Sequence, residues 1–269
     1  MRNYFEDLDA IHLTSEMDNQ LRAQVDVAWP KEVLCLEEHG LKNARNILDI
    51  GTGNAYFLLR LAKRYPEKMF TGIEVSEPLI RVAEELIKEN QLPNVRLVKD
   101  RCPTDRVNAD FDLITARLSL YLMPNREDVI SWSYGLLSKG SRMIITDLMD
   151  FGVHTFPERK GWYKLFRAYA KRCGEQGADR NIGRILPHIL LKNGFKNIKL
   201  DIKQWYSSIE MESETFYSFF KSIAETNHKA MPEYFSKEDL AEFISVLDEI
   251  KRDPTLVAIN PITVVSGMK

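Results

Sequence analysis

A short apolar strand that runs into an acidic residue and a glycine-rich turn constrains this chain more than any other feature. The segment 46–55 reads NILDIGTGNA and places Asp49 just before Gly51 and Gly53. Glycine has no Cβ and reaches positive φ at little cost, so a ligand can lie directly against the main chain of such a turn. The helical periodicity of 56–65 then predicts a helix whose first amide groups favour electron-rich ligand groups. A strand, loop and helix of this kind open a doubly wound α/β sheet.

The spacing of the small residues separates the two nucleotide cofactors that such turns bind. A dinucleotide fingerprint has the pattern G-x-G-x-x-G/A, but Tyr56 stands here in place of its final small residue. The observed D-x-G-x-G-x-A resembles the first motif of class I S-adenosylmethionine-dependent methyltransferases, (D/E)-x-G-x-G-x-G, with Ala55 replacing the last glycine. The resemblance implies S-adenosyl-L-methionine as the cofactor. It also implies that the turn binds it through Asp49, Gly51, Thr52 and Gly53.

Later segments match the same family in the same order. The strand within 68–76 ends in an acid, which can accept both ribose hydroxyls, and the strand within 92–101 ends where the family contacts the adenine amino group. The segment 111–122 resembles the fourth strand and the residues beside the methionine part of the cofactor. The cofactor-binding residues implied here are Glu74, Val75, Asp100, Arg101 and Arg117.

Each acid also has a purely structural interpretation. Asp49 could accept main-chain N–H bonds within the turn, as aspartate often does. Glu74 could be an exposed surface carboxylate, and Asp100 could serve only as a turn residue of a polar loop.

Further matches at 136–147, 190–200 and 262–267 extend the resemblance over most of the chain. They imply an α/β fold with a doubly wound, seven-stranded, mostly parallel sheet, the Rossmann-like methyltransferase fold, in which the last strand is antiparallel beside the sixth. A helical N-terminal cap and two lid insertions are added to this core. The predicted parts are the cap at 1–43, the α/β core at 44–150, a first insertion, helical, at 151–187, core helix and strand 6 at 188–204, a second insertion, also helical, at 205–256, and the final strand at 257–269.

The cap and the insertions are the parts that bear on the substrate. In small-molecule members of the family an arm like the cap folds over the cofactor, and Arg22 and Gln24 have the chemistry to reach its carboxylate, although a solvated helix face is an equal alternative. The first insertion carries an aromatic stripe that either packs in the core or forms a wall beside the cationic sulfonium. The net charges of the insertions are opposite: residues 151–184 include eight basic and three acidic residues, whereas residues 205–255 include five basic and eleven acidic residues. We expect the insertions to attract each other, with a basic lid for an anionic substrate as a further hypothesis.

Composition and absent motifs limit the partners. The formal net charge is −2 and the pI about 6.3, without a basic stripe, so a nucleic-acid partner is not expected. The sequence shows no long apolar run and no signal-like start, which predicts a cytoplasmic protein without a membrane association. The three cysteines and five histidines lack the spacing of a disulfide pair or a metal site, so free thiols and no metal are expected.

These expectations converge on methyl transfer to a small organic acceptor, at O, N or C, by in-line displacement in a lidded pocket. The branch that fits is the ubiquinone/menaquinone-type or natural-product-type methyltransferases. No catalytic base is assigned; His154 is the first candidate and Tyr121 a hydrogen-bonding alternative. Three other hypotheses stay open: a non-catalytic cofactor-binding or scaffold subunit, a protein methyltransferase, and a nicotinamide enzyme. A homodimer is compatible with the sequence.

Overall fold

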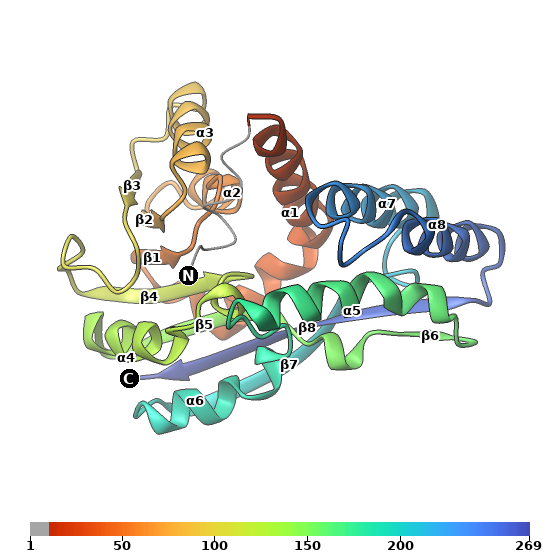
Figure 1. Cartoon of the computed structure of the whole chain (residues 1–269). Helices are drawn as coiled ribbons and strands as arrows, with labels where there is room; N and C mark the ends of the chain where they lie inside the picture. Colours follow the sequence, from red (N-terminus) through yellow and green to blue (C-terminus); the bar gives the residue numbers. More distant parts are fainter. Residues whose placement is uncertain (1–10) are drawn as a thin grey trace.

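The computed structural model describes the main chain of residues 11–269 and the side chains from residue 15 onward (Figure 1). The first ten residues of the predicted cap lie outside this range. The rest of the cap is a single long helix, α1 (Ile11–His39), followed by one 3-10 turn. Within the described residues, no helix is long and apolar enough to cross a membrane.

One mixed sheet forms the centre of the molecule, and its strand order creates the place where a ligand can bind. The order is β3-β2-β1-β4-β5-β8-β6, and β7 pairs with the free edge of β8. Strands β1 to β5 pair in parallel, whereas β8 is antiparallel to β5, β6 and β7. The order reverses between β1 and β4, and ligands of doubly wound sheets bind at the carboxyl ends of the strands at such a switch point. The strands are β1 (Asn46–Ile50), β2 (Met69–Glu74), β3 (Val95–Lys99), β4 (Phe111–Arg117), β5 (Leu137–Leu148), β6 (His154–Phe156), β7 (Lys196–Ser207) and β8 (Val257–Met268).

The predicted fold class is confirmed, with an extra strand and shifted boundaries. The sheet has eight strands, because β6 lies within the first insertion, which is therefore not wholly helical. Its backbone pairs with Val257–Ile259, the start of β8, where that strand extends beyond β5. At the other edge β7 continues to Ser207, so the predicted start of the second insertion at 205 falls inside a strand.

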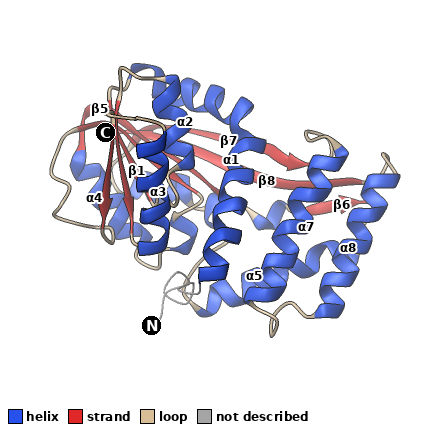
Figure 2. Ribbon diagram, turned by 90° about the horizontal axis from the view of Figure 1, so that it is seen from above, coloured by secondary structure: helices blue, strands red, loops and turns tan. Residues whose placement is uncertain are grey.

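Alternation along the strands sends apolar side chains to two cores, one on each face of the sheet. In β1, for example, Ile47 belongs to one core, whereas Leu48 and Ile50 belong to the other. The first core is completed by α1, α2, α3, α5, α7 and α8, and the second by α4 and α6. Figure 2 shows α5, α7 and α8 grouped beside α1 over the extended ends of β7 and β8. The helices not yet bounded are α2 (Tyr56–Arg64), α3 (Glu77–Glu89), α4 (Arg126–Leu136), α5 (Lys160–Glu175), α6 (Leu186–Lys192), α7 (Ser213–Ala230) and α8 (Lys237–Arg252).

The two insertions contact each other through both apolar and charged groups. Trp162 of α5 is fully buried and stacks on Phe243 of α8, with ring centroids 5.1 Å apart. Lys164 of α5 lies 2.8 Å from carboxylate oxygens of both Asp239 and Glu242. The opposite charges therefore bring α5 and α8 together, as the composition of the insertions predicts.

Candidate functional site

A cavity of about 210 Å³ lies where the carboxyl ends of β1, β2 and β4 meet α1, α5 and α7. It runs from the glycine turn after β1 to the aromatic side chains of the two insertions. All ten residues that the sequence predicts to bind the cofactor line this single cavity. They are Gln24, Asp49, Gly51, Thr52, Gly53, Glu74, Val75, Asp100, Arg101 and Arg117.

The glycine turn presents bare main chain to the cavity. Gly51 and Gly53 have φ of 69° and 59°, values that glycine adopts without strain. A Cβ added at Gly51 would lie 2.6 Å from Cβ of Ser119, so even an alanine does not fit there. Ala55 also has positive φ, at 55°, which explains why this position of the family motif favours a glycine.

Glu74 is buried and holds the turn in place. One carboxylate oxygen, Oε2, accepts a hydrogen bond from the backbone N–H of Gly53 at 2.9 Å. The other, Oε1, accepts from the N–H groups of Val75 and Ser76, both at 2.8 Å. Glu74 is only 5% exposed, and this burial raises the pKa of its carboxyl although the three N–H donors favour the ionised form. The alternative of an exposed surface carboxylate is therefore wrong.

Asp49 lies beneath the turn and does not cap it. Its Oδ1 accepts a hydrogen bond from Oγ1 of Thr115 at 2.7 Å, whereas the N–H groups of Gly51 and Thr52 donate to the carbonyl of Ile73. Burial raises the pKa of Asp49 to about 6, against the opposing effect of its hydrogen bonds. The structural alternative, in which Asp49 accepts main-chain N–H bonds within the turn, is thus not what the structure shows.

Asp100 is a turn residue that also lines the cavity. Its carboxylate accepts from the N–H of Arg101 at 2.8 Å and from Oγ1 of Thr104 at 2.6 Å, as a turn residue does. These hydrogen bonds hold its pKa below the ordinary value. Asp100 nevertheless lines the cavity, so it can contact a ligand from this position.

Arg117 connects α1 to the sheet at the cavity wall. Its Nε lies 2.9 and 3.0 Å from the two carboxylate oxygens of Glu32, a residue of α1 that is fully buried. Its Nη2 donates to the carbonyl of Gln24 and to the hydroxyl of Tyr206, and that hydroxyl donates to the same carbonyl at 3.1 Å. Sequence reasoning missed Glu32, which is 85 residues away from its partner and carries no local motif.

Gln24 and Arg22, considered together from the sequence, point to different places. Gln24 lines the cavity, but Arg22 belongs to a separate surface depression that also contains Tyr56. Arg22 pairs with Asp18 at 2.9 Å, and its guanidinium carbon lies 5.2 Å from the centroid of the Tyr56 ring. The hypothesis that Arg22 reaches into the cofactor site is therefore wrong, because residues two apart on a helix face different sides.

The far end of the cavity has aromatic walls and two buried polar residues, Arg180 and Asn260. The predicted aromatic stripe of α5 divides: Trp162 packs in the core, whereas Leu165, Phe166 and Tyr169 line the cavity. Asn260 of β8 lines it too; the residue is 8% exposed, and its Oδ1 has no hydrogen-bond partner among the described residues. The rest of this wall comprises Leu148, Arg180, Tyr206, Phe219, Phe220, Ile223 and Ile262.

The two candidates for a catalytic base differ in position. His154 is exposed on β6, its Nδ1 lies 2.8 Å from the carbonyl of Gly152, and it does not line the cavity, so it is not placed to act as a base. Tyr121 does line the cavity. Its backbone N–H donates to Asp147, a buried carboxyl whose pKa burial raises to about 7.

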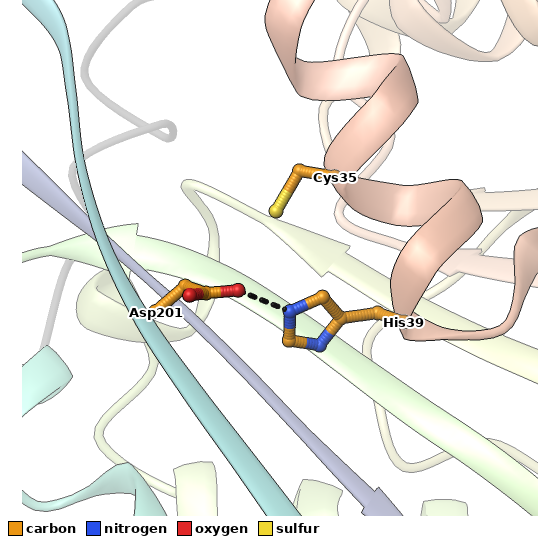
Figure 3. A group of neighbouring side chains, drawn as sticks. All are labelled: Cys35, His39 and Asp201. Carbon is orange, nitrogen blue, oxygen red and sulfur yellow. Dashed lines mark hydrogen bonds and ion pairs between the residues drawn. The ribbon is translucent and has the colours of Figure 1, made fainter.

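A separate polar cluster lies between α1 and β7, away from the cavity (Figure 3). The ring of His39 lies 2.8 Å from a carboxylate oxygen of Asp201 through Nε2 and 2.8 Å from Oγ of Ser266 through Nδ1. The thiol of Cys35 points toward the same region, and ligand atoms of Cys35, His39 and Asp201 lie within 4.8 Å of one another. Burial raises the pKa of this thiol to about 11, so it is protonated at neutral pH. With both ring nitrogens of His39 hydrogen-bonded, we interpret the cluster as a polar tie between α1 and the sheet. The spacing of these residues in the sequence gives no sign of it.

Comparison with known proteins places this geometry in a family. A family model described as "Methyltransferase domain" matches residues 41–186, which span β1 to β5 and the start of α6. Demethylmenaquinone methyltransferase of Listeria welshimeri is 27% identical over 155 residues, 57% of this chain and 62% of the relative. Malonyl-[acyl-carrier protein] O-methyltransferase of a Paenibacillus species is 23% identical over 212 residues, 75% of this chain and 73% of the relative.

The fold is shared with solved structures as well. Phosphoethanolamine N-methyltransferase 2 of Haemonchus contortus, solved with phosphomonomethylethanolamine and S-adenosylhomocysteine, superposes with a TM-score of 0.63 at 17% identity, covering 100% of this chain and 60% of that one. The chain aligns with less than two thirds of the length of the Listeria relative. The match to the family model nevertheless covers more than half of the chain. The chain therefore belongs to the methyltransferase domain family and has the class I S-adenosylmethionine-dependent methyltransferase fold.

Proposed function

We propose that this protein transfers a methyl group from S-adenosylmethionine to a small organic acceptor, as an enzyme of class EC 2.1.1. The observation that carries the proposal is the continuity of the cavity. One cavity joins the glycine turn and Glu74 at one end to the aromatic walls of α5 and α7 at the other. Cofactor and acceptor can therefore meet in it.

The residues at the first end fit the cofactor that the family implies. Only glycine fits at position 51, where a Cβ would clash with Ser119, and the absence of a side chain there lets a ligand lie against the main chain of the turn. Glu74 stands at the tip of β2, where a carboxylate can accept from ribose hydroxyls while Oε1 and Oε2 keep the turn in place. Arg117 offers guanidinium N–H groups beside Gln24 for the carboxylate of the methionine part.

The residues of this chain contribute mainly alignment and exclusion of water. When bound, S-adenosylmethionine would supply an electrophilic methyl group on a sulfonium, and transfer of that methyl to an electron pair of the acceptor would leave a neutral thioether, with the proton of an O–H or N–H acceptor released to solvent. Helices α1, α5 and α7 line the cavity with Leu21, Phe166 and Phe219, whose apolar side chains would limit the access of water to the reacting groups. Holding the two reactants in line is the largest contribution such a site can make.

The alternatives are less compatible with this cavity. A protein methyltransferase needs an open groove for a peptide segment, whereas the acceptor end here is enclosed by two helices of the insertions and by β8. A cofactor-binding scaffold subunit has no need of the buried Arg180 and Asn260 at that end. The named functions of the relatives, methylation of demethylmenaquinone and of malonyl-[acyl-carrier protein], support a methyltransferase activity. A cytoplasmic location, the absence of a nucleic-acid partner and a homodimer stay predictions from the sequence.

Calorimetry on the purified chain tests the cofactor. S-adenosylmethionine and S-adenosylhomocysteine should both bind and raise the midpoint of thermal unfolding, whereas NAD should do neither, because a ligand that binds only the folded state stabilises it. Gly51→Arg should abolish this binding by filling the turn. Binding of NAD alone, or S-adenosylhomocysteine affinity unchanged in the Gly51 variant, would contradict the proposal.

A further inference from the structure

The charges around the cavity are unevenly distributed, and this distribution bears on the acceptor. The acids that line the cavity, Asp49, Glu74 and Asp100, all lie at the end formed by β1, β2 and β3. At the end formed by the insertions, Arg180 is the charged residue that lines the wall among the side chains from residue 15 onward. Its partner Asp150 lies behind it and does not line the cavity.

Arg180 is held rigidly with its positive group toward the cavity. Its Nε and Nη2 donate to the two carboxylate oxygens of Asp150, the second at 3.2 Å, and both side chains are less than a tenth exposed. Its guanidinium carbon lies 4.2 Å from the centroid of the Tyr169 ring and 5.7 Å from that of Tyr121. An arginine has five N–H donors, of which Asp150 takes two. The pair is neutral as a whole, but a group in the cavity meets its positive end first.

The walls beside Arg180 define the rest of the acceptor. Phe166 and Tyr169 of α5 and Phe219 and Phe220 of α7 line this end. Aromatic side chains favour a flat apolar body, which they contact face to face or edge to face. A protonated amine would gain from these rings, but among the residues whose side chains the structure describes it would meet a buried guanidinium and no unpaired carboxylate on this wall.

We propose that the acceptor is a flat, apolar molecule bearing an acidic oxygen group, a phenol, an enol or a carboxyl, and that Arg180 is the residue that selects it. This inference rests on the proposed function and names its substrate class. Arg180 attracts the negative charge that such an oxygen carries or develops, and the low dielectric of the enclosed cavity strengthens the attraction. Ammonium acceptors are selected against by the same field.

Three naphthalene probes of one shape and different charge test the proposal: 1-naphthoate, 1-naphthol and 1-naphthylmethylamine. Their binding is measured by calorimetry at pH 7 with S-adenosylhomocysteine at saturation. At least one of the two acidic oxygen probes should bind the wild-type protein about ten times more tightly than the amine, a difference of about 1.4 kcal/mol. Naphthoate preferred over naphthol assigns a carboxyl, and the reverse assigns a phenol or enol.

Variants of the ion pair identify the residue responsible. Asp150→Asn keeps the shape but removes the countercharge of Arg180, so naphthoate should bind more tightly and the amine more weakly. Arg180→Met combined with Asp150→Asn removes both charges without leaving a buried unpaired carboxylate, and the preference for the oxygen probes should disappear. Arg184→Met removes an exposed arginine four residues away and should change neither affinity.

The outcomes separate this inference from the proposed function. If S-adenosylhomocysteine itself does not bind, the proposed function fails. If it binds, but the amine equals or exceeds the oxygen probes, or no probe binds, the assigned acceptor class is wrong. If the preference survives in the double variant while S-adenosylhomocysteine affinity and the unfolding midpoint stay near wild type, the role of Arg180 is wrong.

Discussion

Replacing Glu74 with glutamine tests the central contact of the cofactor end. The carboxylate accepts three backbone N–H bonds, one at Oε2 from Gly53 and two at Oε1 from Val75 and Ser76. A glutamine has one oxygen and one NH2 group, so it can serve only one of these two sides. The oxygen should keep the two bonds to Val75 and Ser76, and the NH2 group then faces the N–H of Gly53. The turn at Gly53 loses its anchor.

The size of the effect follows from this lost bond. A buried N–H that is left without an acceptor costs about 1–3 kcal/mol in free energy of unfolding. Burial raises the pKa of Glu74, so its ionised form is itself penalised by desolvation. The neutral amide escapes that penalty, and the net loss should lie at the lower end, about 1–2 kcal/mol. The variant also loses the negatively charged acceptor for the ribose hydroxyls, which should weaken S-adenosylhomocysteine binding by about ten- to a hundredfold.

Urea unfolding of the ligand-free protein gives the stability, and calorimetry with S-adenosylhomocysteine gives the affinity. Glu77→Gln is the matched control, because Glu77 lies three residues further on, its side chain is 43% exposed, and its ion pairs within the described chain are with the surface residues Arg81 and Lys99. That control should change the free energy of unfolding by less than about 0.5 kcal/mol and leave binding unchanged. If Glu74→Gln behaves like Glu77→Gln in both measurements, the carboxylate neither holds the turn nor contacts the ribose, and the reasoning is refuted.

Two further predictions concern the glycine turn and Asp147, the buried acid that accepts from the N–H of Tyr121. Gly51→Ala should lower the free energy of unfolding by about 2–4 kcal/mol, because the φ of Gly51 is 69° and the new Cβ would lie 2.6 Å from that of Ser119. Gly135→Ala in α4 is the control: a Cβ there meets nothing within 4 Å, so this variant should be neutral or slightly stabilising in the same urea titration. Equal effects of the two variants would contradict the steric argument. Burial raises the pKa of Asp147 from 3.8 to about 7, so the folded state holds this proton more tightly than the unfolded one. Its contribution to stability is fully present below about pH 4 and is lost as pH rises to about 7, a change on the order of 4 kcal/mol. Unfolding free energies from pH 4 to 8 should therefore fall more steeply for wild type than for Asp147→Asn, and parallel curves would refute the assignment.

The cofactor end could be predicted from the sequence because its determinants are local. Gly51 and Gly53 lie within one turn, and Glu74 and Asp100 come at the ends of strands whose apolar patterns are plain. In a doubly wound sheet the carboxyl ends of the strands lie along one edge, so order along the chain becomes proximity in space. Ten residues chosen in this way line one cavity.

The acceptor end could not be predicted because its determinants are pairs of residues far apart in the chain. Asp150 and Arg180 form an ion pair although they are 30 residues apart in the sequence, and neither belongs to a motif that indicates its partner. Asn260 faces the cavity because β8 returns antiparallel between β5 and β7, which brings it opposite Tyr206. Helical periodicity identified the aromatic stripe of α5 but could not tell which ring faces the core and which the cavity.

The structure of α1 explains why the two ends form one cavity. Residues of α1 line the cavity, and hydrogen bonds hold the helix both beside the cavity and at its C-terminal end. On the cavity side Glu32 and the carbonyl of Gln24 hold the guanidinium of Arg117 from β4, while Tyr206 of β7 donates to that same carbonyl. At its C-terminal end His39 joins the helix to β7 and β8. Because Arg117 belongs to β4, beside the switch point, and Tyr206 belongs to β7, which leads into the second insertion, one helix carbonyl joins a strand of the cofactor end to a strand of the acceptor end. The position of α1 over the cavity is therefore set by both ends of the site together. This is the condition for aligning a cofactor held at one end with an acceptor held at the other.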